Sequence, residues 1–184
     1  EKDVCFEREA LRVIRAEPVA WALLAPKKLA ATFDYCGAGP WYLHQASPES
    51  FGGTAKLVWG ALETLVQRLL LAAALAVAAL TTARAWTPPL RRAFVYGALG
   101  LAVLPWAWLG VLVFTGLGLA PPAGTTAKRR VALGLAATVT GTTALIHAIF
   151  FGAGRYGLVI VPGLALAAAC LRWPFDTAPE NPDD

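Results

Sequence analysis

The chain has 184 residues, of which 57% are hydrophobic and 15% are charged, whereas soluble domains average about 45–50% apolar and about 25% charged residues. Its net charge of +4 is unevenly spread. Eight carboxylates lie within residues 1–63 and four within residues 176–184, while residues 64–175 contain nine Lys and Arg but no Asp or Glu. This pattern disfavours a soluble globular domain and a nucleic-acid-binding protein, and it is typical of membrane helices joined by cationic loops.

The first 56 residues differ from the rest, because charged, proline-rich and glycine-rich segments alternate there. Phe6, Ala10, Val13 and Ile14 are spaced so that they share one apolar face of a helix, and the opposite face is charged. Pro18 is expected to end this helix or to begin the next, and residues 37–53 are predicted to be a surface loop. We predict that residues 1–56 form an amphipathic helical lobe on the membrane plane, with a lobe packed on a larger partner domain as the alternative.

Residues 57–173 contain four apolar blocks, and we predict an all-α polytopic membrane domain with spans near 62–83, 95–119, 131–152 and 156–172. The second block is uncharged from residue 93 to residue 120. As one helix it would be about 42 Å long, against a hydrocarbon core of about 30 Å, so a kink at Pro105 is expected. Arg68, at the edge of the first block, is expected to snorkel to the headgroups. Residues 174–184 are predicted to be a disordered acidic tail.

The sidedness of the chain is left open by two opposing signals. With four spans, the N-terminal lobe and Lys128-Arg129-Arg130 share one side of the membrane, and Arg84, Arg91, Arg92 and Arg155 share the other. Basic residues near the span ends then number six against four, which slightly favours a cytoplasmic N-terminal side. Cys5 and Cys36 favour the opposite, since they could form a disulfide in an oxidising compartment. Two unrelated free thiols are the alternative.

The chain shows no autonomous catalytic or metal site. Residues 64–175 lack the paired carboxylates of general acid–base chemistry. The two histidines, His44 and His147, have no second ligand at metal-binding spacing. We therefore predict no metal and no cofactor, and we expect this chain alone not to be catalytic. The candidate binding residues are single polar groups in apolar surroundings: His147, Arg155, Tyr156 and Lys28.

Each candidate has a structural alternative. His147 is either a neutral side chain bonded to a neighbouring helix or a contact to a substrate or lipid phosphate. Arg155 and Tyr156 follow a glycine-rich turn at the membrane edge, where the arginine either snorkels or binds a phosphate in two parallel hydrogen bonds. Lys28 is either a lipid-headgroup anchor or a contact to a polyprenyl phosphate.

Two segments resemble a family of membrane enzymes. His147-Ala-Ile-Phe-Phe-Gly-Ala-Gly-Arg155-Tyr156, followed by Pro162 and a Leu/Ala helix, resembles the C-terminal end of dolichyl-phosphate-mannose protein mannosyltransferases, glycosyltransferase family 39 and its relatives. Residues 10–18 and 24–29 resemble the amphipathic segment before the last spans of that family. Gly157 departs from the pattern, since Arg or His often follows the Arg-Tyr pair in the family.

The resemblance implies the C-terminal membrane module of a GT-C type transferase that moves a sugar from a polyprenyl-phosphate donor. This module would help to bind the donor lipid, with Arg155 near a phosphate, but would lack the catalytic acid, which the family carries in an early extracytoplasmic loop. The absence of methionine, even at position 1, favours a fragment whose partner is the N-terminal remainder of a larger protein in a bacterial inner membrane. A non-catalytic four-helix membrane subunit or assembly protein is the alternative.

Overall fold

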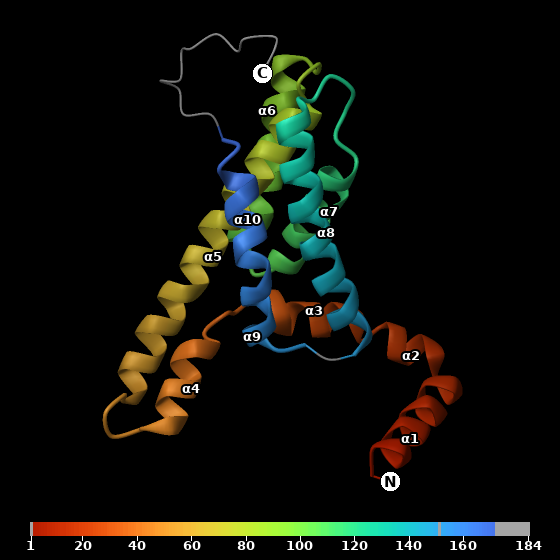
Figure 1. Cartoon of the computed structure of the whole chain (residues 1–184), viewed down its shortest axis with the longest axis vertical. Helices are drawn as coiled ribbons and strands as arrows, with labels where there is room; N and C mark the ends of the chain where they lie inside the picture. Colours follow the sequence, from red (N-terminus) through yellow and green to blue (C-terminus); the bar gives the residue numbers. More distant parts are fainter. Residues whose placement is uncertain (1, 151, 172–184) are drawn as a thin grey trace.

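The computed structural model describes residues 2–150 and 152–171, with side chains from Glu7 onward, and all regular structure in this range is helical (Figure 1). The predicted all-α class is thus confirmed. A lobe of four helices comes first: α1 (Lys2–Ala16), α2 (Pro18–Ala22), α3 (Ala25–Phe33) and α4 (Ala38–Ala46). A bundle follows, made of α5 (Gly53–Thr82), α6 (Pro88–Val103), α7 (Ala107–Leu119), α8 (Ala127–Ile149), α9 (Gly154–Gly157) and, after a 3-10 turn, α10 (Val161–Ala168). The predicted tail, 174–184, lies outside the described residues.

Two helices among the described residues, α5 and α8, are long and apolar enough to cross a membrane. Less than half of the most apolar stretch of each helix is buried inside the chain, 44% for α5 and 39% for α8. Much of their apolar surface therefore faces outward. Helix α7 and the segment Gly154–Ala168 are also apolar but shorter.

The predicted helix over residues 95–119 is wrong in one respect, because the chain reverses at Pro105 instead of kinking. Leu104 is extended and Trp106 is also non-helical, as expected for the residue before a proline and for a break in the helix. The two arms then run antiparallel: a Cβ placed on Gly110 would lie 3.4 Å from Leu101 Cβ. Helices α6 and α7 thus form a hairpin (Figure 1).

The hairpin changes the predicted sidedness. Because α7 returns toward the end from which α6 starts, the loop between α7 and α8 lies beside the C-terminal end of α5. Both contribute to one cavity, together with the end of the α10 segment. Lys128-Arg129-Arg130 therefore lies at the same end as Arg84, Arg91 and Arg92, not opposite them as predicted from four simple spans.

The core lies where α5, α7, α8 and α10 meet, and small residues bring the helices close together. The fully buried large side chains there include Leu71, Leu75, Val111, Phe114, Leu133 and Leu164. Gly118 of α7 packs against α8 so closely that an added Cβ would lie 3.0 Å from the carbonyl oxygen of Leu133 and 2.7 Å from Ala137 Cβ. Close backbone approach at Gly and Ala is the packing mode of membrane helices.

The lobe meets the bundle at one end only. Helix α3 packs against α7, α8 and α9, and α4 packs against α5. The prediction of a loop over residues 37–53 is wrong for its first half, since α4 occupies Ala38–Ala46. Pro40 lies in the first turn of α4, where a helix needs no backbone donor. Helix α1 extends away from the bundle (Figure 1), with Leu11 and Val13 exposed.

Candidate functional site

A cavity of about 450 Å³ opens where α3, α4 and α9 converge. Helix α3 contributes Ala30, Ala31 and the residue after its end, Asp34. Helix α4 contributes the aromatic pair Trp41 and Tyr42, and the α9 segment contributes Arg155. The cavity thus combines an apolar and aromatic lining with one guanidinium and one carboxylate.

Three glycines hold the α9 segment against α3. A Cβ at Gly152 would collide with the backbone of Lys28, one at Gly154 with the carbonyl oxygen of Tyr35, and one at Gly157 with that of Thr32. These glycines have the spacing G-x-G-x-x-G, but the segment follows helix α8 and the glycines face α3. The nucleotide-binding form of this motif needs a preceding strand and glycines that face a ligand. Their role here is close backbone contact, which places Arg155 at the cavity.

The structure brings Arg155, Tyr156 and His147 together, three residues that the sequence offered as separate candidates. The exposed Arg155 guanidinium donates hydrogen bonds to the hydroxyls of Tyr42 and Tyr156, the second at 2.7 Å, and its centre lies 4.7 Å from the Tyr156 ring. The Tyr156 ring also stacks on the ring of the buried His147, with 4.5 Å between the ring centroids. Tyr42 and Trp41 were missed from sequence, because their segment was predicted to be a loop.

Lys28 lies apart from this cluster. Its Nζ donates a 2.8 Å hydrogen bond to the carbonyl of Ile149, at the C-terminal end of α8, and lies 5.1 Å from the centroid of Trp21. A cation near a helix C-terminus stabilises the unpaired carbonyls there. Lys28 therefore contacts α8 and α2 and does not line the cavity.

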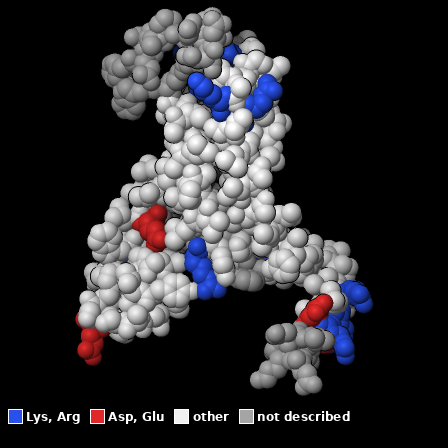
Figure 2. All heavy atoms as spheres, in the orientation of Figure 1, with Lys and Arg blue, Asp and Glu red and all other residues white. Residues whose placement is uncertain are grey.

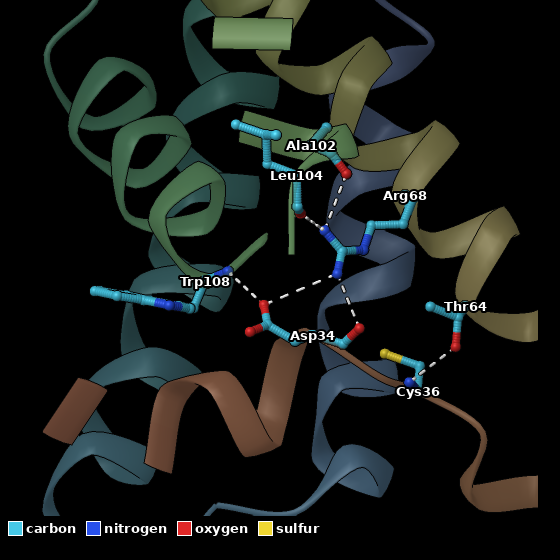
Figure 3. A network of polar contacts seen from close by, with 7 residues as sticks. All are labelled: Asp34, Cys36, Thr64, Arg68, Ala102, Leu104 and Trp108. Carbon is cyan, nitrogen blue, oxygen red and sulfur yellow. Dashed lines mark hydrogen bonds and ion pairs between the residues drawn. The ribbon is translucent and has the colours of Figure 1, made fainter. Parts of the chain in front are cut away.

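Arg68 and Asp34, the second of which also lines the cavity, join the lobe to the α6–α7 hairpin (Figure 3). Arg68 donates to the carbonyls of Ala102 and Leu104, at 3.0 and 2.7 Å, and to the backbone carbonyl of Asp34 at 2.8 Å. The Asp34 carboxylate accepts the backbone N–H of Trp108 at 3.3 Å and lies 3.9 Å from the guanidinium. One side chain thus binds carbonyls at the end of α6, and the other binds an N–H in the first turn of α7.

The prediction that Arg68 snorkels to the headgroups is wrong. Its side chain is only 16% exposed and points into the molecule. The reason is the break at Pro105, which leaves carbonyls at the end of α6 without intrahelical donors. Burial raises the pKa of the Asp34 carboxyl, and this outweighs the lowering effects of the Trp108 N–H and the Arg68 charge.

Cys36 is fully buried, and its backbone N–H donates to the Thr64 hydroxyl at 3.1 Å. Burial raises the pKa of this thiol to about 12. The side chain of Cys5 lies outside the described residues, so the Cys5–Cys36 disulfide stays a prediction.

We expect Cys36 to resist alkylation in the folded protein at pH 8, since the thiolate is the reactive form and the thiol is inaccessible. Mass spectrometry after iodoacetamide treatment, with and without denaturation and without reductant, measures this. A free Cys36 is labelled only after unfolding. Rapid labelling before unfolding would contradict its burial, and absence of labelling in both states would indicate a disulfide.

The lining of the site suits binding of an anion with an apolar body. No group of three or more His, Cys, Asp and Glu side chains that could hold a metal occurs within residues 2–150 and 152–171. A guanidinium flanked by tyrosine hydroxyls can bind a phosphate or carboxylate.

Comparisons with protein-family models, curated proteins and solved structures give no match for this chain.

Proposed function

We propose that this chain is the C-terminal membrane module of a polyprenyl-phosphate-sugar-dependent glycosyltransferase, and that the Arg155 cavity binds the phosphate of the donor lipid. One observation carries the proposal: an exposed guanidinium at the rim of an apolar, aromatic-lined cavity of about 450 Å³. The catalytic acid would come from outside this chain. The resemblance of residues 147–156 to family 39 transferases favours this ligand over other anions.

We propose that the chain is integral to a bacterial inner membrane. Four apolar segments would lie in the bilayer: α5, the α6–α7 hairpin, α8 and the segment Gly154–Ala168. At about 1.5 Å per residue, α6 and α7 are each shorter than a bilayer core of about 30 Å, so the hairpin would enter from one side without crossing twice. Large exposed apolar side chains support this location, among them Leu62, Leu65, Leu69, Val131, Leu135 and Leu145.

The distribution of cations supports an orientation for the site. Six basic residues gather at the end of the bundle far from the lobe: Arg84, Arg91, Arg92, Lys128, Arg129 and Arg130. Figure 2 shows part of this group in blue at the top. Short loops rich in Lys and Arg stay in the cytoplasm. The Arg155 cavity would then face the extracytoplasmic side, where the resembled family carries its catalytic acid.

Binding would divide the donor lipid between two kinds of contact. The phosphate would accept hydrogen bonds from Arg155 and from the hydroxyls of Tyr42 and Tyr156. The Arg155 guanidinium already bonds both hydroxyls, that of Tyr156 at 2.7 Å. Charge-assisted hydrogen bonds of this kind are the strongest available to a phosphate at an interface. The first isoprene units would lie along Trp41 and the alanines of α3, since both line the same cavity.

Arg155→Lys is expected to weaken binding of undecaprenyl phosphate by about tenfold, because an ammonium cannot reproduce the two parallel N–H donors of a guanidinium. Tryptophan fluorescence of the full chain in nanodiscs, titrated with undecaprenyl phosphate, measures the affinity. The matched control is Arg92→Lys, an exposed arginine at the other end of the bundle, which is expected to bind like the wild type.

The lipid alcohol undecaprenol completes the test. If the cavity recognises the phosphate, undecaprenol binds the wild type no better than undecaprenyl phosphate binds Arg155→Lys. Equal affinity of the wild type for the phosphate and the alcohol would overturn the proposal. Equal affinities of the wild type, Arg155→Lys and Arg92→Lys for the phosphate would also overturn it, and the structural-subunit alternative would then stand.

A further inference from the structure

A second and larger cavity, of about 970 Å³, lies at the basic end of the bundle. It is formed by the end of α5, the loop between α7 and α8, the first turn of α8 and the end of the α10 segment. Three of its lining residues are cations from two elements: Arg84, Lys128 and Arg129. The Arg155 site does not involve any of them.

Two of the three lining cations, Lys128 and Arg129, lie at the positive end of a helix dipole, and Arg84 follows the C-terminal end of α5. Lys128, Arg129 and Arg130 occupy the first turn of α8, and Arg91 and Arg92 lie near the start of α6; neither helix has an acidic residue in its first turn. A helix N-terminus carries the positive end of the helix dipole, so carboxylates are the usual residues there. The positive end of α8 and its cations Lys128 and Arg129 therefore lie at the cavity, which favours an anionic ligand there.

The remaining lining suits a molecule with both polar and apolar parts. Thr82 Oγ1 is buried and has no hydrogen-bond partner among the described residues. Arg129 donates to the carbonyl of Cys170 at 3.0 Å, which holds this side chain at the cavity wall. Leu80, Ala132 and Leu171 add apolar surface. An anion with a hydrocarbon body meets all these groups at once.

We propose that the cavity framed by Arg84, Lys128 and Arg129 binds the phosphate headgroup of an anionic phospholipid of the cytoplasmic leaflet. The phosphate would sit between these cations at the first turn of α8, and Thr82 would donate its hydroxyl hydrogen. The upper acyl carbons would contact Leu80 and Leu171. Basic pockets between membrane helices on the cytoplasmic side bind anionic headgroups by this combination.

Native mass spectrometry of the full chain in detergent, titrated with phosphatidylglycerol or phosphatidylcholine, tests the proposal. The wild type is expected to bind phosphatidylglycerol at least about tenfold more tightly than phosphatidylcholine. The combined variant Arg84→Gln, Lys128→Gln, Arg129→Gln is expected to lose this preference. The matched control is Arg8→Gln, Arg12→Gln, Arg15→Gln, which removes three cations from the exposed α1 and is expected to keep the preference.

Each result of this titration either supports or overturns the proposed lipid site. A wild type that binds both lipids equally, or control and cavity variants that lose the preference equally, would overturn the site. Soluble glycerol phosphate, added in excess, is expected to leave bound phosphatidylglycerol in place; its displacement would show that the cavity binds a free phosphate and not a lipid. Because Arg155 is untouched in both variants, binding of undecaprenyl phosphate remains an independent measurement.

Discussion

Gly157→Ala is expected to lower the free energy of unfolding by about 3 kcal/mol, the upper part of the range for overpacking a core. The added methyl group would collide with the carbonyl oxygen of Thr32 and lie 2.9 Å from the Cys36 sulfur and 3.4 Å from Gln67 Nε2. Thr32, Cys36 and Gln67 are each at most 1% exposed. The two nearest atoms belong to the tightly packed α3 region, so α9 would have to move away from α3.

Unfolding by sodium dodecyl sulfate, followed by circular dichroism in mixed micelles, measures this loss. Gly134→Ala is the control, since a Cβ there meets nothing within 4 Å inside helix α8. It is expected to leave stability unchanged or to raise it by up to about 1 kcal/mol through helix propensity. Equal stabilities for the two variants would contradict the close packing of α9 on α3.

The helices that sequence predicted best are those whose formation depends on local apolar content. The predicted spans 62–83 and 131–152 fall within or near α5 (Gly53–Thr82) and α8 (Ala127–Ile149). Both are unbroken by proline, so length and composition suffice to predict them. In the second block a kink was predicted at Pro105, and the helix instead breaks there. Its consequence, a reversal, depends on Arg68 and Asp34, which bind the two sides of the turn from distant positions.

Three residues of the candidate site were named from sequence, but as separate candidates. Arg155, Tyr156 and His147 are close in sequence, and a glycine-rich turn near a helix end brings them together. Tyr42 comes from a segment whose Gly and Pro content predicted a loop, and no local signal places its hydroxyl against Arg155. The wrong sidedness of Lys128-Arg129-Arg130 follows from the same cause as the hairpin, because one reversal exchanges the ends of every later helix.

Arg68→Met is expected to lower the free energy of unfolding by about 3 kcal/mol or more, comparable to the loss of one partner of a buried ion pair. Methionine keeps the apolar stem but removes every N–H donor. The carbonyls of Ala102, Leu104 and Asp34 would then lose their bonds to the guanidinium, in a region where Arg68 is 16% and Asp34 22% exposed. Each buried carbonyl left unpaired costs about 1 to 3 kcal/mol.

Two companion variants separate the hydrogen bonds from the charge. Asp34→Asn is expected to cost much less, because Arg68 bonds the backbone carbonyl of Asp34, which asparagine keeps, and the amide oxygen can still accept from Trp108. Burial raises the pKa of the Asp34 carboxyl in the folded chain. The stability of the fold therefore falls as the pH rises above the pKa of an unfolded aspartate, where Asp34 ionises. Asparagine does not ionise, so it removes this loss. Arg92→Met, at an exposed position, is expected to change stability by no more than about 0.5 kcal/mol.

Cross-linking between α6 and α7 tests directly whether the two helices form a hairpin. Cysteines introduced as Leu101→Cys and Gly110→Cys, with the native cysteines replaced by alanine, have a Cβ separation of 3.4 Å in the folded chain, close to the range for a disulfide. We expect them to cross-link readily under mild oxidation, and more slowly when Arg68→Met is added. If this pair does not cross-link in the presence of Arg68, α6 and α7 do not reverse at Pro105, and the six basic residues do not share one end of the bundle.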